Sequence, residues 1–198
     1  MSAGARLGRD FYDRPVLEVA RDLVGVTVRH GDSAGRIVET EAYHHSEPAC
    51  HAYVGVTQRT STLFGPAGAA YVYRSYGIHA LLNAVCEPKN VGAAVLIRAL
   101  EPVAGVDLMR ARRGIERADG LCSGPGKLTQ ALGIDTDLNA TSLIDGPIEL
   151  LAGAGCPHVV SGKRIGITKA IELPWRFCDA DSVHVSRPWP AELRRRAA

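Results

Sequence analysis

The chain has 198 residues, of which 46% are hydrophobic and 22% are charged. These values are typical of one globular domain with a buried core, and they exclude a disordered or collagen-like chain. The formal net charge of +2 neither requires nor excludes a nucleic-acid partner, because such binding depends on a local basic face.

The sequence has no long apolar run and no cysteine pair of the C-x-x-C type. Residues 1–11 lack the apolar core of a signal peptide, and no later run approaches the roughly 20 residues that span a membrane. The five cysteines are scattered, which argues against a disulfide framework or a structural zinc site. We therefore expect a cytoplasmic protein with reduced thiols that is not secreted and does not bind membranes.

Helix signals occur at three places along the chain. Asp13, followed by Pro15 and an apolar run that stops at Gly25, predicts a short helix with Asp13 as its N-cap. Two further helices are predicted from Pro102 to about Arg113 and in the segment that Ser123 opens and Gly133 stops.

Strand signals dominate the rest of the sequence. Residues 70–85 predict a β-hairpin with Tyr76 at or near its tip, because Ser75-Tyr76-Gly77 interrupts two β-prone flanks. Residues 44–70 have no periodicity, and loops of this length are often functional. The remaining predicted strands are residues 25–30, 34–43, 91–100, 147–153, 163–168 and the region around 175–178. The pattern predicts one β-rich α+β domain over residues 1–198, with a frayed tail at about 190–198.

Two glutamates share the strand predicted at 34–43. In a regular strand Ile37, Glu39 and Glu41 point one way, and residues 38, 40 and 42 point the other way. Like charges that lie close together raise the pKa of one carboxyl group, which suits a general base. The alternative is a solvated pair of glutamates on an edge strand, and this pattern alone favours that alternative.

Aromatic residues and histidines gather around this strand and the hairpin, although aromatic residues make up only 6% of the chain. Flat side chains at a site indicate a flat or cationic ligand, whereas packed core tyrosines are the alternative and the favoured one for Tyr71. A metal site is the less favoured reading of His44, His45, Cys50 and His51, because they lack a recurrent ligand spacing. The whole group comprises Tyr43, His44, His45, His51, Tyr53, Tyr71, Tyr73 and Tyr76.

Arg98 lies inside the apolar run VLIRAL. A buried arginine needs a partner, because an unpaired buried charge is costly. Glu39 or Glu41 can supply that partner, or Arg98 can hold a phosphate or a water molecule. The residues alone leave these alternatives open.

The order of the motifs resembles one enzyme family. RLGRDFYDRP, GRIVETEAY, PACHAY, FGPAGAAYVYRSYGIHALLN, VLIRALEP and LCSGPGKLTQALGI follow one another over residues 6–186. In this combination the chain resembles the alkyladenine (3-methyladenine, alkylpurine) DNA glycosylases. The resemblance implies a base-excision-repair enzyme with an antiparallel, partly open β-barrel-like sheet, short flanking helices and a protruding β-hairpin.

The resemblance also implies roles for individual residues. Such an enzyme flips a damaged purine out of duplex DNA and hydrolyses its glycosidic bond, leaving an abasic site. Glu41 would activate the water, Arg98 would place it, and Tyr76 would intercalate through the minor groove. Asn83 would stand at the pocket wall and disfavour guanine. Tyr43, His51 and Tyr73 would line the base pocket.

The same resemblance predicts the partners. Duplex DNA with damaged purines is the expected substrate, bound by a monomer that needs no metal or other cofactor and has access to chromosomal DNA. Ser123, Gly124 and Lys127 would contact a DNA phosphate, because backbone N–H groups at a helix start can hold one. An ordinary helix start with a solvated Lys127 is the alternative.

Three departures from the family pattern concern lesion range and DNA binding. The loop between Glu41 and His51 is one residue shorter than in typical relatives and carries His44-His45 where Leu-Gly is usual. The segment TQRTSTLF lacks the pattern Arg-Thr-Pro-Arg-Asn, and Arg74 places a charge beside Tyr73.

Two other functions compete with the glycosylase. A non-catalytic nucleic-acid binding module has no need of a carboxylate such as Glu41 facing a phosphate-rich partner. A small hydrolase using His51 with Cys50 lacks an identifiable third group to orient the histidine.

Overall fold

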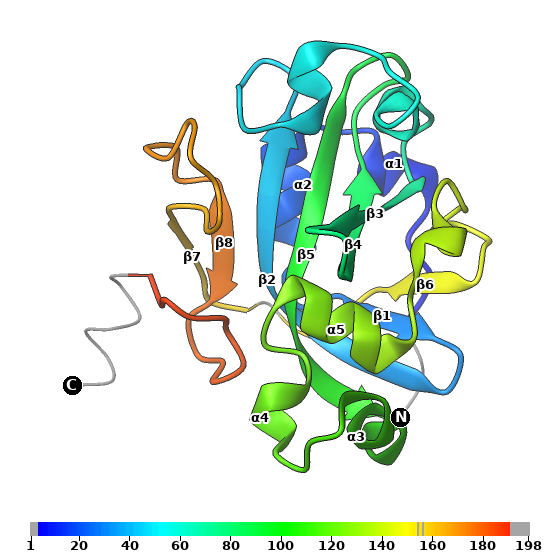
Figure 1. The fold of residues 1–198 in the computed structure, drawn as a ribbon, viewed down its shortest axis with the longest axis vertical. Coiled ribbons are helices and arrows are strands. Elements are labelled where there is room, and N and C mark those ends of the chain that lie inside the picture. The colour runs from blue at the N-terminus through cyan, green and yellow to red at the C-terminus, as the bar shows by residue number, and fades with distance from the viewer. Residues whose placement is uncertain (1–3, 154, 156, 191–198) are drawn as a thin grey trace.

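The computed structural model describes residues 4–153, 155 and 157–190 (Figure 1). The α-helices are α1 (Arg9–Tyr12), α2 (Val16–Asp22), α3 (Val106–Arg113), α4 (Ala118–Leu121) and α5 (Pro125–Leu132). Three short 3-10 helices are η1 (His51–Val54), η2 (Ser61–Phe64) and η3 (Thr136–Leu138). The strands are β1 (Thr27–His30), β2 (Ser33–His44), β3 (Ala70–Ser75), β4 (His79–Val85), β5 (Ala93–Ala104), β6 (Ile148–Leu151), β7 (Val159–Gly162) and β8 (Arg176–Asp179).

All eight strands join one antiparallel sheet. Its main order is β3-β4-β5-β2-β1-β6, and β8 pairs with β2 while β7 pairs with β8. The sheet curls into an incomplete barrel flanked by short helices, with the β3–β4 hairpin standing out from it (Figure 1). This confirms the predicted α+β fold with a partly open, barrel-like antiparallel sheet. No helix in the described part of the chain is long and apolar enough to cross a membrane.

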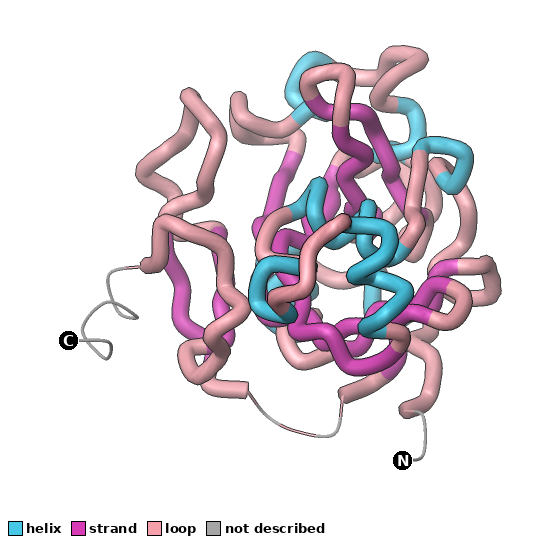
Figure 2. The backbone as a smooth tube through the Cα atoms, turned by 60° about the horizontal axis from the view of Figure 1, so that its bottom comes forward, coloured by secondary structure: helices cyan, strands magenta, loops and turns pink. Residues whose placement is uncertain are grey.

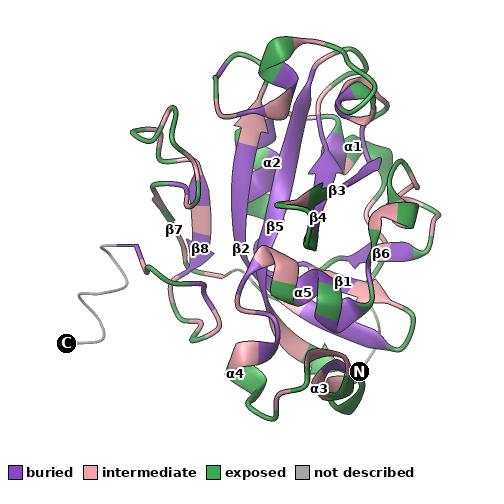
Figure 3. Ribbon diagram, viewed as in Figure 1, coloured by how far each residue is buried: buried purple, intermediate pink, exposed green. Residues whose placement is uncertain are grey.

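β2 is the central strand of this sheet. One of its edges pairs with β5 along residues 34–44, and its other edge pairs first with β1 and then with β8. Strands β2 and β5 are accordingly buried over most of their length (Figure 3). The reading of Glu39 and Glu41 as a solvated pair on an edge strand is therefore wrong, because neither residue has any exposed surface.

Two irregularities interrupt the pairing of β2 with β5. Val38 has no partner between the pairs Ile37–Leu100 and Glu39–Ala99, and Arg98 has none between Ala99 and Ile97. A bulge re-aims the side chains around it. Ile37 packs in the main core, while Val38 packs in a separate cluster beside β8. The prediction that Ile37 and Glu39 point to the same side of the strand is therefore wrong.

The main core joins the helices to the sheet. Val19 and Ala20 of α2, Leu128 of α5 and Ile97 of β5 belong to one buried cluster. When the lower side of Figure 1 is turned forward, helices lie in front of the strands and long loops surround them (Figure 2). Thr40 also faces this core, because its hydroxyl group donates to the carbonyl oxygen of Ala20 at 2.7 Å.

Three local predictions are wrong, two at an element's boundary and one in the element itself. Asp13 ends α1, with its N–H bonded to the carbonyl oxygen of Arg9, and Pro15 is the N-cap of α2. β5 runs through Pro102 to Ala104, and α3 starts after Gly105, whose φ of +66° and close approach to the Asp32 carbonyl suit glycine. The third is the predicted strand at 163–168, which is irregular backbone after β7.

The other predicted elements are present. The hairpin at 70–85 forms with its turn around Tyr76, and α5 runs from Pro125 to a left-handed Gly133. The frayed tail predicted at about 190–198, apart from residue 190, lies outside the described residues.

Candidate active site

A cavity of about 680 Å³ opens between the β3–β4 hairpin, η1 and the loop at 163–170. Ile165 to Lys169 form one wall, and Pro125 at the start of α5 closes another side. The site residues predicted from the sequence that line it are Tyr43, His51, Tyr73, Tyr76, Asn83 and Arg98. The fold therefore brings most of the predicted residues to one place from five separate parts of the chain.

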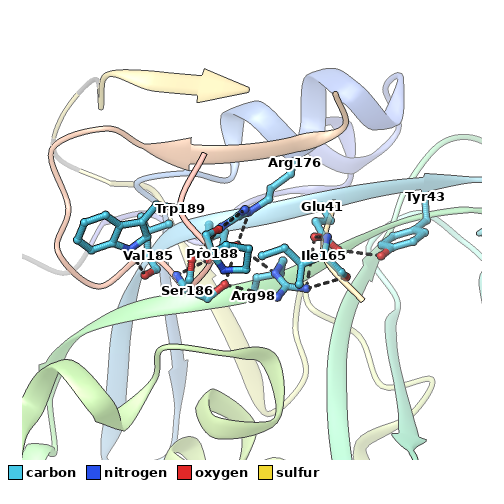
Figure 4. A network of polar contacts seen from close by, with 10 residues as sticks. Glu41, Tyr43, Arg98, Ile165, Arg176, Val185, Ser186, Pro188 and Trp189 are labelled. Atoms are coloured by element: carbon cyan, nitrogen blue, oxygen red, sulfur yellow. Dashed lines mark hydrogen bonds and ion pairs between the residues drawn. The ribbon is translucent and has the colours of Figure 1, made fainter. Parts of the chain in front are cut away.

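Glu41 lies directly behind the wall of this cavity. Its Oε1 accepts a hydrogen bond from the Ile165 N–H at 2.7 Å, and its Oε2 accepts one from the Tyr43 hydroxyl group at 2.8 Å (Figure 4). Arg98 Nη1 lies 3.3 Å from Oε1. A carboxylate offers about four acceptor positions, so these three donors from the described residues leave one position for a further donor.

Burial raises the pKa of Glu41 above its ordinary value. The charge of Arg98 and the hydrogen bonds from Ile165 and Tyr43 act in the opposite direction without cancelling the effect of burial. A carboxylate with a raised pKa is a better proton acceptor near neutral pH than an ordinary glutamate.

Glu39, two residues away, is held by a different set of partners. Its Oε1 accepts hydrogen bonds from Arg98 Nε at 3.0 Å, Arg176 Nε at 2.6 Å and the Ser186 hydroxyl group at 2.9 Å. Its Oε2 accepts one from the Ser186 N–H at 2.7 Å. Three of these four donors share Oε1, and two of them are arginines, so Glu39 anchors both Arg98 and Arg176.

Arg98 connects the two glutamates. Besides its contacts with both carboxylates, its Nη2 donates to the Ser186 hydroxyl group at 3.4 Å and its Nη1 to the Ile165 carbonyl oxygen at 3.5 Å. Arg98 lies at the bulge in β5, and a bulge of this kind can turn its side chain toward the two glutamates of β2. The structural reading of Arg98 as the partner of Glu39 or Glu41 is confirmed for both residues at once.

Aromatic rings form a further part of the cavity wall. Tyr71 and Tyr73 are stacked with ring centres 5.2 Å apart, and His51 meets Tyr73 edge-on at 4.7 Å. His51 Nδ1 lies 3.1 Å from the Tyr71 hydroxyl oxygen. Burial and the nearby charge of Arg59 lower the pKa of His51, so a neutral ring is favoured. Tyr71 is buried among apolar residues, as predicted, and it also lines the cavity.

Asn83 stands opposite Tyr71 in the hairpin register. Its Nδ2 donates to the carbonyl oxygens of Tyr71 at 3.0 Å and Leu81 at 3.4 Å. These bonds fix the amide plane at the cavity wall.

Tyr76 lies at the tip of the hairpin and is 92% exposed. Its φ of 49° and that of Gly77, 72°, form a tight turn that the Ile78 N–H closes on the Ser75 carbonyl oxygen at 3.0 Å. A tyrosine in the left-handed region is unfavourable, and the turn places its large ring in solvent.

Other predicted residues lie at the margin of the cavity or away from it. Gly124 is the N-cap of α5, and Lys127 Nζ lies 3.4 Å from the Ser123 hydroxyl oxygen, with both side chains along a second groove. Arg74 lines the cavity and forms an ion pair with Asp135 at 3.1 Å. His44, His45 and Tyr53 do not line the cavity.

The Cys50–His51 pair does not have the geometry of a nucleophile and its base. The Cys50 Sγ accepts a hydrogen bond from the Ala52 N–H, and burial raises the pKa of this thiol to about 11. A protonated thiol is a poor nucleophile at neutral pH. Among the described residues no group of three His, Cys, Asp or Glu side chains is arranged to hold a metal ion.

Sequence reasoning missed several partners of the two glutamates. Arg176 carries the same signal as Arg98, a charge inside an apolar strand, and could have been found by it. Ser186 and the Ile165 N–H have no comparable signal, because a serine in a loop and a backbone group are featureless in the sequence.

Comparisons with known proteins show the family of the chain. The sequence model of the family described as "Methylpurine-DNA glycosylase (MPG)" matches residues 10–183. A relative from Bradyrhizobium diazoefficiens is 54% identical over 187 residues, which cover 94% of each chain. One from Rhodopseudomonas palustris (strain CGA009) is 52% identical over 187 residues, covering 94% of this chain and 91% of the relative. One from Methanoculleus marisnigri is 52% identical over 185 residues, covering 89% and 96%.

Each of these three relatives bears the name "Putative 3-methyladenine DNA glycosylase". The family match covers most of the chain, including β2, η1, the hairpin, β5 and α5. The chain belongs to the methylpurine-DNA glycosylase family.

Proposed function

We propose that this protein is a monofunctional DNA glycosylase that removes alkylated purines, of the 3-methyladenine and 7-methylguanine type, from duplex DNA. The observation that carries the proposal is Glu41, a buried carboxylate with a raised pKa that touches Arg98 behind an aromatic cavity. Family membership supplies the substrate class.

In the proposed reaction Glu41 accepts a proton from a water molecule held in the cavity. The water oxygen bonds to the anomeric carbon of the sugar, and the bond from that carbon to the purine nitrogen breaks. The electron pair leaves with the base, so a cationic alkylpurine departs as a neutral molecule. The transition state resembles an oxocarbenium ion, which the negative charge of Glu41 stabilises.

Arg98 is proposed to place this water. Arg98 lines the cavity, its Nη1 lies 3.3 Å from Glu41 Oε1, and Glu39 and Ser186 restrain its other nitrogens. Because the Arg98 side chain is already held in place, binding the water costs little additional side-chain entropy.

The cavity wall is proposed to select the base. Tyr43 and the stacked Tyr73, with His51 at its edge, offer flat electron-rich surfaces that favour a cationic purine. Asn83 is proposed to oppose the exocyclic amino group of undamaged guanine, since its amide is fixed at the wall.

The hairpin and the start of α5 are proposed to hold the DNA. Tyr76 would enter the minor groove and fill the space that the flipped nucleotide vacates, which partly offsets the lost stacking. Ser123, Gly124 and Lys127 would contact a phosphate on the same face, because α5 also borders the cavity through Pro125. We propose that the protein acts on DNA as a monomer.

Release of free base is the test. The wild-type protein is expected to release 3-methyladenine from a methylated duplex, and Glu41→Gln is expected to lose that release. A panel of duplexes carrying hypoxanthine or ethenoadenine then defines the lesion range. Salt-dependent DNA binding without any released base, from a folded wild-type protein, would instead identify a non-catalytic DNA-binding module.

A further inference from the structure

Arg164 and Glu47 form a buried ion pair beside the cavity. Arg164 Nη1 lies 2.7 Å from Glu47 Oε1, and Nη2 lies 3.0 Å from Oε2, so the two groups meet in a two-pronged arrangement. The Arg164 side chain has no exposed surface, and that of Glu47 is 6% exposed. Such geometry fixes the guanidinium plane as well as its position.

The same guanidinium joins three segments of the chain. Nη1 also donates to the carbonyl oxygen of Ala42 in β2 at 2.9 Å, and Nη2 to that of Ala170 at 3.4 Å. Glu47 belongs to the loop that follows β2, and Ala170 ends the loop that supplies the Ile165 wall. Arg164 therefore ties that wall to β2.

Arg164 lies next to two of the three donors on Glu41. The guanidinium carbon lies 4.7 Å from the ring centre of Tyr43 and 5.3 Å from that of Trp175. Tyr43 lines the cavity while Arg164 does not, so Arg164 supports the ring from behind. The next residue, Ile165, gives its N–H to Glu41.

We propose that Arg164, fixed by Glu47, is a positioning residue that holds the Tyr43 hydroxyl group and the Ile165 N–H on Glu41. This inference rests on the proposed function of Glu41 as the base. Arg164 touches neither substrate nor water, and it acts through the two groups that set the orientation and ionisation of Glu41.

The charged and titratable groups around Glu41 determine in which direction its pKa changes when Arg164 is lost. Arg98 faces Glu41 from β5, Glu39 and Tyr43 lie beside it on β2, and Arg164 acts from the loop after β7. Loss of the Ile165 and Tyr43 hydrogen bonds removes two influences that lower the pKa of Glu41. The pKa then rises further, and a smaller fraction of Glu41 is ionised at a given pH.

The experiment uses the full-length protein and three variants. Arg164→Met removes the charge and keeps an apolar chain between the two rings. Arg164→Met combined with Glu47→Leu removes both charges, because an unpaired buried glutamate alone can prevent folding. Arg36→Met is the control, since Arg36 is likewise an ion-paired arginine but contacts Glu101 and Asp179 outside the cavity lining.

Single-turnover release of 3-methyladenine is measured against pH, with thermal unfolding as the check on folding. The double variant is expected to fold and to lose about 10²-fold in rate at neutral pH. The acid limb of its pH profile is expected to move upward by about one pH unit. Arg36→Met is expected to keep the wild-type rate and profile. A double variant with the wild-type rate and acid limb would overturn the positioning role.

A second readout is independent of catalysis. Nuclear magnetic resonance of carboxyl-labelled glutamate, assigned with Glu41→Gln, follows the titration of Glu41 directly. The pKa of Glu41 is expected to be higher in the double variant than in wild type, and equal pKa values would overturn the inference. If wild type releases no base, the proposed function fails, while this titration still decides the role of Arg164.

Discussion

Glu39 and Glu41 are the same residue type on the same strand, and both are completely buried, yet their surroundings differ. Glu39 receives four hydrogen bonds, two of them from arginines, and the C-terminal segment around Ser186 covers it. Glu41 touches one arginine, one phenol and one backbone N–H, each of which lines the cavity. Both side chains are equally buried, so the difference lies in their partners: those of Glu39 join separate segments of the fold, and those of Glu41 border the cavity.

Arg98 links the two glutamates, since it contacts both carboxylates. Because Glu39 binds its Nε, the guanidinium is already oriented when its Nη1 meets Glu41. We infer that Glu39, by holding Arg98, orients the arginine for Glu41, which is a form of preorganisation.

The largest expected effect separates the two glutamates by activity. Glu41→Gln keeps the shape of the side chain but removes the proton acceptor, so single-turnover base release is expected to fall by roughly 10³-fold. The pKa of Glu41 is higher in the folded than in the unfolded protein, so the ionised carboxylate destabilises the fold at pH values above the unfolded pKa. The amide of Gln is neutral and therefore removes this destabilisation at neutral pH. Arg98 keeps Glu39 as a counter-charge, so thermal unfolding is expected to show no large loss of stability. A wild-type rate in this variant would remove Glu41 from the mechanism.

The second prediction separates the two glutamates by stability, because Glu39 is expected to matter more for the fold than Glu41. Glu39→Gln leaves Arg98 and Arg176 without their shared counter-charge in a buried site. Removing one partner of a buried ion pair costs about 3–5 kcal/mol. The thermal midpoint is expected to fall by roughly 10 °C. The control Glu101→Gln removes a partly exposed partner of Arg36 and is expected to cost less than about 1 kcal/mol. Equal midpoints for the two variants would contradict the anchoring role.

The hairpin tip provides a residue that serves neither glutamate. Tyr76→Ala is expected to reduce base release about tenfold by weakening capture of the flipped nucleotide, since the lost contact replaces base stacking. The fold should be unaffected, because the Tyr76 side chain lies in solvent. Stopped-flow fluorescence of a base analogue beside the lesion separates flipping from bond cleavage. The control is Tyr53→Ala, an exposed tyrosine outside the cavity lining. Intact flipping with a collapsed chemical step would reject this role.

The smallest effect tests how one donor tunes Glu41. Base release requires ionised Glu41, so the wild-type rate is expected to decline as pH falls through a pKa that lies above the ordinary 4.5. Tyr43→Phe removes a hydrogen bond that lowers this pKa, so the acid limb should move upward by about half a pH unit or more. The rate at neutral pH should fall less than about tenfold. An unshifted acid limb would mean that the phenol does not act on Glu41.

Local patterns predicted the elements that carry the cavity. The strand signals at 34–43 indicated β2, the turn at Ser75-Tyr76-Gly77 indicated the hairpin, and Gly133 marked the end of α5. These features depend on neighbouring residues, and local physics decides them.

Burial of β2 could not be predicted in the same way. Glu39 is covered by Arg176 and Ser186. These two residues lie 137 and 147 positions away from it in the sequence. The bulges at Val38 and Arg98 depend on how two distant strands match, so they broke the simple alternation expected at Ile37. The roles of the site residues came from the family resemblance and remain predictions.

The chain leaves the sheet at Gly162, and Ile165 therefore lies outside any ladder. In a ladder the N–H of each residue is committed to a neighbouring strand or to solvent at an edge. Here it is free to bind Glu41. A backbone donor has no side chain to lose, so alanine scanning at this position leaves the hydrogen bond in place, and among natural residues proline alone deletes it. This part of the centre is thus insensitive to most point substitutions, and an ester in place of the amide would reveal it.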